Sequence, residues 1–333
     1  MIIVRTPLRV GLLGGGTDYP EYFSKHGGGR TLVAAIDKYC TISVRWLPKF
    51  FDYRSRVAWS RIEYVKDNSE IRNPIVRECL RFLQIDDGVD VVYQGDLPAR
   101  SGLGTSSAFA VGLLQALHVL RDGKHIGRSR LAKEAIIIER DYCHSVAGFQ
   151  DQIACTFGGM SLISIAEDGD TTVMPCGGGN FLDCGEERLE ELASRLMLFY
   201  TGTQRDASGV ATTQMEQVEG KEKGYRRLAE MALDGLSVFE GGNLDHFGLL
   251  LEEGWQIKRK LAGGITSPHL DELHDKIIDA GARGCKIVGA GGGGFALAYV
   301  PKDKDRKLVE SRSGLVEVPF QFDVGGSRII WEG

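Results

Sequence analysis

Residues 97–109 read LPARSGLGTSSAF, a glycine-containing loop that runs into an apolar segment over 108–120. Apolar residues recur in that segment at helical spacing, so the stretch predicts a loop followed by a helix. A glycine loop that opens a helix directs several backbone N–H groups to one point, where the helix dipole also favours an anion. The stretch therefore indicates a phosphate-binding loop. An ordinary capped helix start remains open, because Thr105, Ser106 and Ser107 are all good N-cap residues.

The composition is that of a globular protein with an unusually high glycine content. Hydrophobic residues make up 43% of the 333 residues and charged residues 26%, which is typical of a folded domain. The formal net charge of −5 provides no general attraction to nucleic acid or to an anionic membrane, so neither is expected as a partner. The 44 glycines fall in clusters without a short repeat, which excludes collagen-like and low-complexity proteins.

Cysteine usage and the N-terminal sequence indicate the compartment. The seven cysteines are scattered, odd in number and without a C-x-x-C pair, which argues against a disulfide framework and against a zinc site. The chain shows no signal-peptide core and no apolar run long enough to cross a bilayer. We therefore expect a soluble cytoplasmic protein. The oligomeric state stays open, with a homodimer as one option.

Apolar periodicity predicts strands and helices without a regular β-α-β alternation, which favours an α+β fold over a doubly wound sheet. The glycine-rich, acidic stretch 176–187 is the best linker candidate, and we expect domains over 1–180 and 181–333. The expected strands cover 2–13, 31–47, 57–65, 89–93, 160–165, 171–175, 196–200, 285–288, 295–300, 316–322 and 328–331. The expected helices cover 69–83, 106–120, 129–143, 148–156, 207–219, 225–239, 244–261, 268–280 and 304–311.

Two carboxylates follow the predicted phosphate loop. Glu139 lies on an apolar face of the helix expected over 129–143, where a carboxylate is costly unless a cation or a donor meets it. A solvated charge paired with a neighbouring arginine is the alternative. Asp151 follows in GFQDQIA, and its alternative is a helix-start acid stabilised by the dipole. One carboxylate to hold a metal and one to orient or deprotonate a hydroxyl are the minimum for phosphoryl transfer to an alcohol.

Two further glycine runs are candidate ligand loops. Residues 14–18 (GGGTD) bring the backbone close to a ligand and place Asp18 to accept hydrogen bonds, although a tight turn capped by Asp18 explains them equally well. Residues 289–294 (GAGGGG) separate two apolar strands, and four consecutive glycines are costly in chain entropy, which favours a functional loop. Neither run forms a spaced dinucleotide fingerprint or a Walker-type loop.

Together, the segments TPLRVGLLGGGTDY, LPARSGLGTSSAF and KIVGAGGGGF resemble the three motifs of the GHMP kinase superfamily, which includes galactokinase, homoserine kinase and mevalonate kinase. The segments occur in the family order and span nearly the whole chain. The resemblance implies an α+β fold of two domains. The N-terminal domain would be like the second domain of ribosomal protein S5, and the C-terminal domain would be ferredoxin-like. ATP and magnesium are expected between them.

By position in these motifs, the resemblance implies a role for each candidate residue. Asp151 matches the general base that acts on the sugar hydroxyl, and Arg9 matches a basic residue near that aspartate and the transferring phosphate. Ser106 and Glu139 match the magnesium ligands. The ATP phosphates would be bound by Gly102, Leu103, Gly104, Thr105, Ser106 and, at lower rank, Ser107. The acceptor is expected to contact Gly15, Gly16, Thr17, Asp18, Gly291 and Gly292.

Gly15 and Gly16 stand where galactokinases have Glu-His, which removes two polar side chains that would hold a hexose. The segments GGGTDYPEYF, GLGTSSAFAVGLL, FQDQIA and YTGTQR most resemble the D-glycero-D-manno-heptose 7-phosphate kinases, which phosphorylate the anomeric hydroxyl. A phosphorylated acceptor needs a basic contact, and Arg205 is the first candidate, followed by Arg30 and Lys38. An unphosphorylated acceptor such as L-fucose or a galactose-like hexose is one alternative, and a non-catalytic sugar- or nucleotide-binding relative is another.

Overall fold

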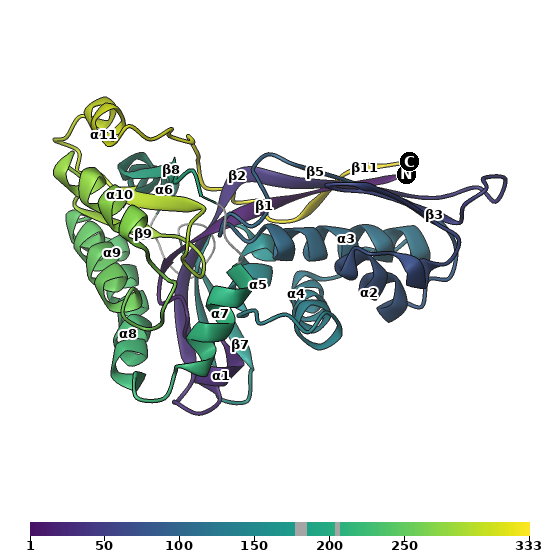
Figure 1. The fold of residues 1–333 in the computed structure, drawn as a ribbon, viewed down its shortest axis with the longest axis horizontal. Coiled ribbons are helices and arrows are strands. Elements are labelled where there is room, and N and C mark those ends of the chain that lie inside the picture. Colours follow the sequence, from purple (N-terminus) through teal and green to yellow (C-terminus); the bar gives the residue numbers. More distant parts are fainter. Residues whose placement is uncertain (177–184, 204–206) are drawn as a thin grey trace.

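The computed structural model describes residues 1–176, 185–203 and 207–333 and places them around two β-sheets (Figure 1). The large sheet is built on two long antiparallel strands, β1 (Ile2–Leu13) and β2 (Gly29–Trp46). Their register shifts between Pro7 and Leu8 and again between Gly11 and Leu13, so β1 is one long irregular strand. A proline has no N–H to give to the ladder, and it is accommodated at such an irregularity.

Six shorter strands complete the large sheet, whose main order is β11-β1-β2-β5-β3-β4. They are β3 (Ser55–Ala58), β4 (Ile62–Val65), β5 (Val89–Gly95), β6 (Met160–Ile165), β7 (Thr171–Cys176) and β11 (Arg328–Glu332). The first part of β2 pairs with β6 and the last part with β5, so one strand belongs to two branches of the sheet.

Helices cover one face of this sheet, with α3 (Thr105–Asp122) at the centre (Figure 1). Residues of α3 are buried on nearly all sides, which explains why its sequence is apolar on every face of the helix. Its neighbours are α2 (Pro74–Phe82), α4 (Arg128–Ile137) and α5 (Gln150–Phe157). A π-helical turn (Ile138–Tyr142) continues α4, and two short elements, α1 (Pro20–Phe23) and a 3₁₀ turn (Asn68–Glu70), complete this part.

The small sheet is antiparallel in the order β8-β10-β9, formed by β8 (Leu196–Tyr200), β9 (Gly284–Ile287) and β10 (Phe295–Tyr299). The helices of this half are α6 (Glu186–Arg195), α7 (Ala207–Glu216), α8 (Glu222–Gly241), α9 (Asp245–Lys258), α10 (Pro268–Asp279) and α11 (Arg306–Ser313). Helix α8 packs on β1 and β2 of the large sheet and on α9. Helix α9 contacts β9 and β10 of the small sheet and also β1, so α9 joins the two sheets.

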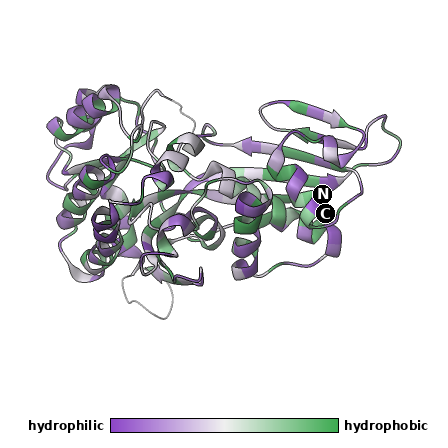
Figure 2. Cartoon of the chain, turned by 60° about the horizontal axis from the view of Figure 1, so that its bottom comes forward, coloured by the Kyte–Doolittle hydropathy of each residue, from purple (hydrophilic) through white to green (hydrophobic). Residues whose placement is uncertain are grey.

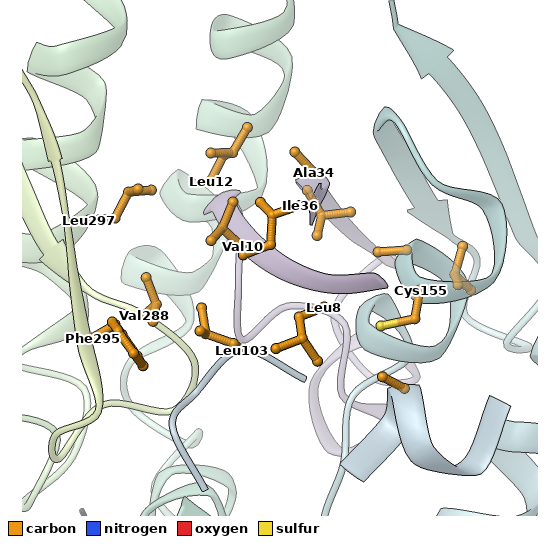
Figure 3. Packing of buried hydrophobic residues seen from close by; sticks show 14 of the residues in the cluster. Leu8, Val10, Leu12, Ala34, Ile36, Leu103, Cys155, Val288, Phe295 and Leu297 are labelled. Carbon is orange, nitrogen blue, oxygen red and sulfur yellow. The ribbon is translucent and has the colours of Figure 1, made fainter. Parts of the chain in front are cut away.

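One hydrophobic core runs from the large sheet to the small one. Figure 3 shows Leu8 and Val10 of β1 close to Leu103 of the glycine loop, with Phe295 of β10 on the opposite side. Hydrophobic and hydrophilic stripes alternate on the peripheral helices, as expected where one face packs on the core (Figure 2). No helix in the described ranges is both long and apolar enough to span a membrane.

The predicted α+β fold is confirmed, and two of the predicted strands need correction. The strand predicted over 57–65 is a hairpin, β3 and β4, which turns at residues 59–61. The strand predicted over 316–322 forms only isolated bridges, to β8 at Glu317 and to β2 at Phe322, because this segment crosses from one sheet to the other.

The predicted division at residue 180 lies within 177–184, outside the described residues, so it stays a prediction. Of the expected linker, Gly185 is the N-cap of α6, and Glu186 and Glu187 already belong to that helix. Strand β11 pairs with β1, so the large sheet contains residues from both sides of the predicted division.

Candidate active site

A cavity of about 290 Å³ lies where the start of α3, the first glycine loop and the loop after β9 meet. Side chains from segments far apart in the chain line it. The predicted residues among its lining are Arg9, Gly15, Gly16, Asp18, Gly102, Gly104, Thr105, Ser106, Ser107, Glu139 and Asp151. The structure therefore brings most of the predicted site together in one place.

The predicted phosphate loop is shaped by Gly102 and Gly104, whose φ angles are 78° and 73°. Gly104 is the N-cap of α3 and supplies no side-chain cap, so the first N–H groups of the helix are available to an anion. The third glycine loop packs directly on this one, because a Cβ on Gly289 would lie 2.6 Å from the Cα of Gly102. Only glycine permits this approach of the two backbones.

Arg9 on β1 connects the phosphate loop to Asp151 at the start of α5. Its Nε donates to Oδ1 of Asp151 at 2.6 Å, and its Nη2 donates to Oδ2, which makes a two-point ion pair. Its Nη1 donates to the carbonyl oxygen of Gly102 at 2.6 Å, and its backbone N–H donates to that of Leu103 at 3.0 Å. The Asp151 side chain keeps 24% exposure and lines the cavity, so a ligand can reach its carboxylate.

Glu139 lies in the π-helical turn after α4, where the sequence predicts a continuous α-helix. Its buried carboxylate accepts hydrogen bonds of 2.6 Å from the hydroxyls of Ser106 and Ser107 and from Nε2 of Gln152. Burial raises the pKa of the Glu139 carboxyl, these hydrogen bonds act in the opposite direction, and the charge of Asp151 adds to the rise. π-helical turns are frequent at functional sites, and this one contains Glu139, the residue predicted to bind the metal.

The residues present fit a magnesium ion and the phosphates of a nucleotide. Thr105 Oγ1 and Ser101 Oγ are buried at the cavity wall without hydrogen-bond partners, which leaves polar atoms unsatisfied beside the predicted phosphate site. Glu139 and Ser106 supply the oxygen donors that Mg²⁺ prefers. Since the described residues contain no cluster of three or more His, Cys, Asp or Glu, phosphate oxygens and water would complete the shell.

The first glycine loop is held by two buried side chains that face the protein itself. The hydroxyl of Thr17 donates to the carbonyl oxygens of Gly14 and Arg30, each at 2.9 Å, and Thr17 does not line the cavity. Asp18 lines the cavity but is fully buried, and it accepts hydrogen bonds from the backbone N–H groups of Gly16 and Gln150. Burial raises the pKa of Asp18, and the charge of Asp151 adds to the rise. Both residues therefore fix the loop rather than present free polar groups.

Several predicted acceptor contacts lie elsewhere. Gly291 and Gly292 are buried against Ile265, whose carbonyl oxygen accepts from the N–H of Gly292 at 2.8 Å, and the third loop reaches the cavity through Gly289 and Ala290 instead.

Of the three basic residues proposed for the acceptor's phosphate, the two that the structure describes do not line the cavity. Arg30 is exposed on β2 and Lys38 pairs with Asp37 at 3.2 Å, and neither lines the cavity. Arg205 lies outside the described residues.

The cavity also holds basic residues that the sequence did not reveal. Lys258 ends α9 and Lys286 lies on β9, and both are buried at the cavity wall. In the sequence, the position of Lys286 within an apolar strand, between Cys285 and Ile287, is the signal that could have indicated its burial. Lys258 had no comparable signal, because a lysine in the last turn of a helix is usually solvated and favourable to the dipole.

Two protein-family models match segments of the chain. The family described as GHMP kinases N terminal domain matches residues 73–159, which contain the glycine loop, Glu139 and Asp151, and the family described as GHMP kinases C terminal matches residues 236–312. The chain belongs to the GHMP kinases. This kinase is therefore related to ATP-dependent phosphotransferases.

Individual relatives cover nearly all of this GHMP kinase. It is 29% identical to a D-glycero-alpha-D-manno-heptose 7-phosphate kinase of Campylobacter jejuni, over 93% of this chain and 92% of that protein. It is 26% identical to an L-fucokinase/L-fucose-1-P guanylyltransferase of Bacteroides fragilis, over 90% of this chain and 34% of that protein. A crystal structure described as a D-glycero-D-manno-heptose 1-phosphate kinase from Bacteroides thetaiotaomicron has the same fold, with a TM-score of 0.79, 23% identity and coverage of 100% of this chain and 99% of that one.

Proposed function

We propose that this GHMP kinase transfers the terminal phosphoryl group of ATP, in the presence of magnesium, to the anomeric hydroxyl of a sugar. The observation that carries the proposal is the two-point ion pair between Arg9 and Asp151, which holds a reachable carboxylate beside the start of α3. Glu139 lies in the same cavity. A base for a hydroxyl, donors for phosphates and a ligand for a metal are the parts that phosphoryl transfer requires.

Each part has a separate task in the reaction. Asp151 accepts a hydrogen bond from the acceptor hydroxyl, orients its oxygen and takes its proton as the new O–P bond forms. Arg9 holds Asp151 in this orientation and places positive charge beside the transferring group. The N–H groups at the start of α3 bind the nucleotide phosphates. Glu139 and Ser106 would hold a magnesium ion, which would neutralise phosphate charge.

We infer that the acceptor is D-glycero-D-manno-heptose 7-phosphate and the product its 1,7-bisphosphate. Similarity to a heptose 7-phosphate kinase over nearly the full length of both chains supports this choice. Gly15 and Gly16 support it as well, because both line the cavity and neither fills it with a side chain. The related crystal structure described as a heptose 1-phosphate kinase supports the fold alone, at 23% identity.

A comparison of acceptors tests this proposal. The second candidate is a kinase of an unphosphorylated sugar such as L-fucose, which the match to the fucokinase part of a longer protein favours. We expect kcat/KM on heptose 7-phosphate to exceed that on heptose, L-fucose and galactose by about 100-fold, the contribution of two charge-assisted contacts. If L-fucose is phosphorylated faster than heptose 7-phosphate, L-fucose is the acceptor instead. If none of these sugars is phosphorylated at the expense of ATP, the kinase proposal is contradicted.

The adjacent serines offer a matched pair for the metal site. Ser106 is exposed to the cavity whereas Ser107 is 4% exposed, although both donate to Glu139. We expect Ser106→Ala to raise the Mg²⁺ concentration for half-maximal rate by about tenfold, the effect of one lost ligand. Ser107→Ala is expected to leave it unchanged and to lower the free energy of unfolding by about 1 kcal/mol. Magnesium titration of the rate and thermal unfolding measure the two effects. A larger change in the magnesium requirement for Ser107→Ala than for Ser106→Ala would assign the metal ligand to Ser107.

A further inference from the structure

Three buried donors that the proposed mechanism does not use face the same cavity. Lys258 of α9 and Lys286 of β9 are only 6% and 9% exposed. Gln214 of α7 is 2% exposed and also lines the cavity. Lysine and glutamine are seldom buried without partners, so their place here needs an explanation.

Neither ammonium group forms an ion pair with a carboxylate within the described part of the protein. Their hydrogen bonds there go to backbone carbonyls: Lys258 donates to Gly289, and Lys286 donates to Gly11 at 3.0 Å and to Leu12 at 2.9 Å. Burial lowers the pKa of Lys258 to about 8, although the charges of Asp18 and Asp151 act in the opposite direction. Burial also lowers the pKa of Lys286, and the nearby charge of Lys258 lowers it further. Two neighbouring cations without a carboxylate partner are costly in a folded protein unless an anion joins them.

The amide of Gln214 adds an independent unsatisfied donor. Its Nε2 is buried and has no hydrogen-bond partner. A Cβ on Gly16 would lie 2.8 Å from that nitrogen, so the amide rests against the first glycine loop. Leaving a buried N–H unpaired costs free energy, which a ligand that accepts a hydrogen bond recovers.

We propose that Lys258, Lys286 and Gln214 form a subsite for a phosphate monoester carried by the acceptor sugar. This inference rests on the proposed kinase function. It names the residues that bind the phosphate group already present on the acceptor. Phosphate oxygens supply the hydrogen-bond acceptors that the three side chains lack and the negative charge that the two lysines lack.

The contacts of the three donors place the subsite on the acceptor side of the cavity. Gly11 and Leu12, which hold Lys286, directly precede the first glycine loop, and Gln214 touches Gly16 within it. Lys258 also contacts Gly289, which packs on the phosphate loop, so the terminal phosphate of the nucleotide is the competing ligand. The experiment must separate these two phosphates.

The test measures binding by calorimetry for three ligands: D-glycero-D-manno-heptose 7-phosphate, the same heptose without phosphate, and ATP with Mg²⁺. The variants are Lys258→Met, Lys286→Met and Gln214→Leu, and Lys260→Met, which removes an exposed lysine two residues beyond Lys258, is the control. We expect the wild type to bind the phosphorylated heptose about 100-fold more tightly than the heptose. Each lysine variant should lose about tenfold of that preference and Gln214→Leu somewhat less, because charged hydrogen bonds are the stronger ones.

Three further results complete the test. Affinity for ATP should stay within about twofold in every variant, and Lys260→Met should match the wild type. Lys258→Met should unfold at the same temperature as the wild type or a higher one, because it removes a buried charge, so its loss of binding cannot come from misfolding.

The outcomes distinguish the subsite from the kinase proposal. Weaker ATP binding with an unchanged preference for the phosphorylated sugar would assign the lysines to the nucleotide and overturn the subsite. A wild type that binds both heptoses equally would overturn it too. If the lysine variants lose the preference while the wild type transfers no phosphoryl group from ATP to any sugar, the subsite stands and the kinase proposal fails.

Discussion

Replacement of Asp151 by asparagine is expected to lower kcat on the acceptor sugar by about 10²–10⁴-fold, the usual contribution of a positioned general base. The amide oxygen still accepts a hydrogen bond from Nε of Arg9, so the local shape is retained, but an amide cannot take the proton of the hydroxyl. The affinity for ATP should hold, because Asp151 contacts neither the glycine loop nor Glu139 by a hydrogen bond among the described residues. Steady-state kinetics and ATP calorimetry measure the two effects.

The same substitution is expected to cost stability. It leaves the guanidinium of Arg9, whose side chain is 5% exposed, without its carboxylate, which should lower the free energy of unfolding by about 1–3 kcal/mol. Kinetics must therefore be measured well below the unfolding temperature of the variant. Asp170→Asn, at an exposed position in the turn between β6 and β7, is the control and should change neither rate nor stability. A near-normal rate for Asp151→Asn would refute its assignment as the base.

Replacement of Glu139 by glutamine is expected to weaken magnesium binding strongly and to lower kcat/KM by about 10²-fold, since it removes the only charged ligand assigned to the ion. The fold should tolerate this change. Burial already raises the pKa of Glu139, so a neutral side chain removes an unfavourable charge. Gln152 can adapt, because its Oε1 is buried without a partner and an amide flip would turn that oxygen toward the new NH₂ group.

Magnesium titration of the rate and thermal unfolding test this second prediction together. We expect the half-maximal Mg²⁺ concentration to rise more than about tenfold while the unfolding temperature stays equal or increases. Asp141→Asn changes an exposed carboxylate in the same π-helical turn and should leave the magnesium requirement unchanged. An unaltered magnesium requirement in Glu139→Gln would exclude this carboxylate as a metal ligand.

Much of the fold was predictable because local pattern and tertiary structure agree. The strands expected over 160–165 and 196–200 match β6 and β8 at both ends, since each is an apolar run with clear breaks. Residues 316–322 have an equally strand-like pattern, but they make isolated bridges to two different sheets. Which sheet a segment joins depends on packing between distant parts of the chain, and the periodicity of the local sequence does not contain that information.

The site was predictable to the extent that its chemistry depends on backbone geometry. Glycines at 102 and 104 mark positions where side chains are excluded, and Arg9 and Asp151 lie near other glycines of the sequence. Glu139 gave a different signal, a carboxylate on an apolar helix face. Lys258 and Lys286 escaped notice because a lysine is solvated in most proteins, and only the folded structure reveals that these two are buried. Asp18 lines the cavity, but its oxygens also accept hydrogen bonds from the backbone N–H groups of Gly16 and Gln150 and from the Gln150 side chain, which the sequence did not indicate.

The contacts of Arg9 make the two halves of the cavity interdependent. One guanidinium bonds both the carbonyl of Gly102 in the predicted phosphate loop and the carboxylate of Asp151, so any shift of that loop alters the orientation of the proposed base. A nucleotide that reorganises the loop therefore changes the free energy with which the acceptor binds. By thermodynamic linkage the effect is mutual: the acceptor must change the affinity for the nucleotide by the same factor. This residue thus gives the enzyme a physical route to substrate synergism, in which each substrate prepares the protein for the other.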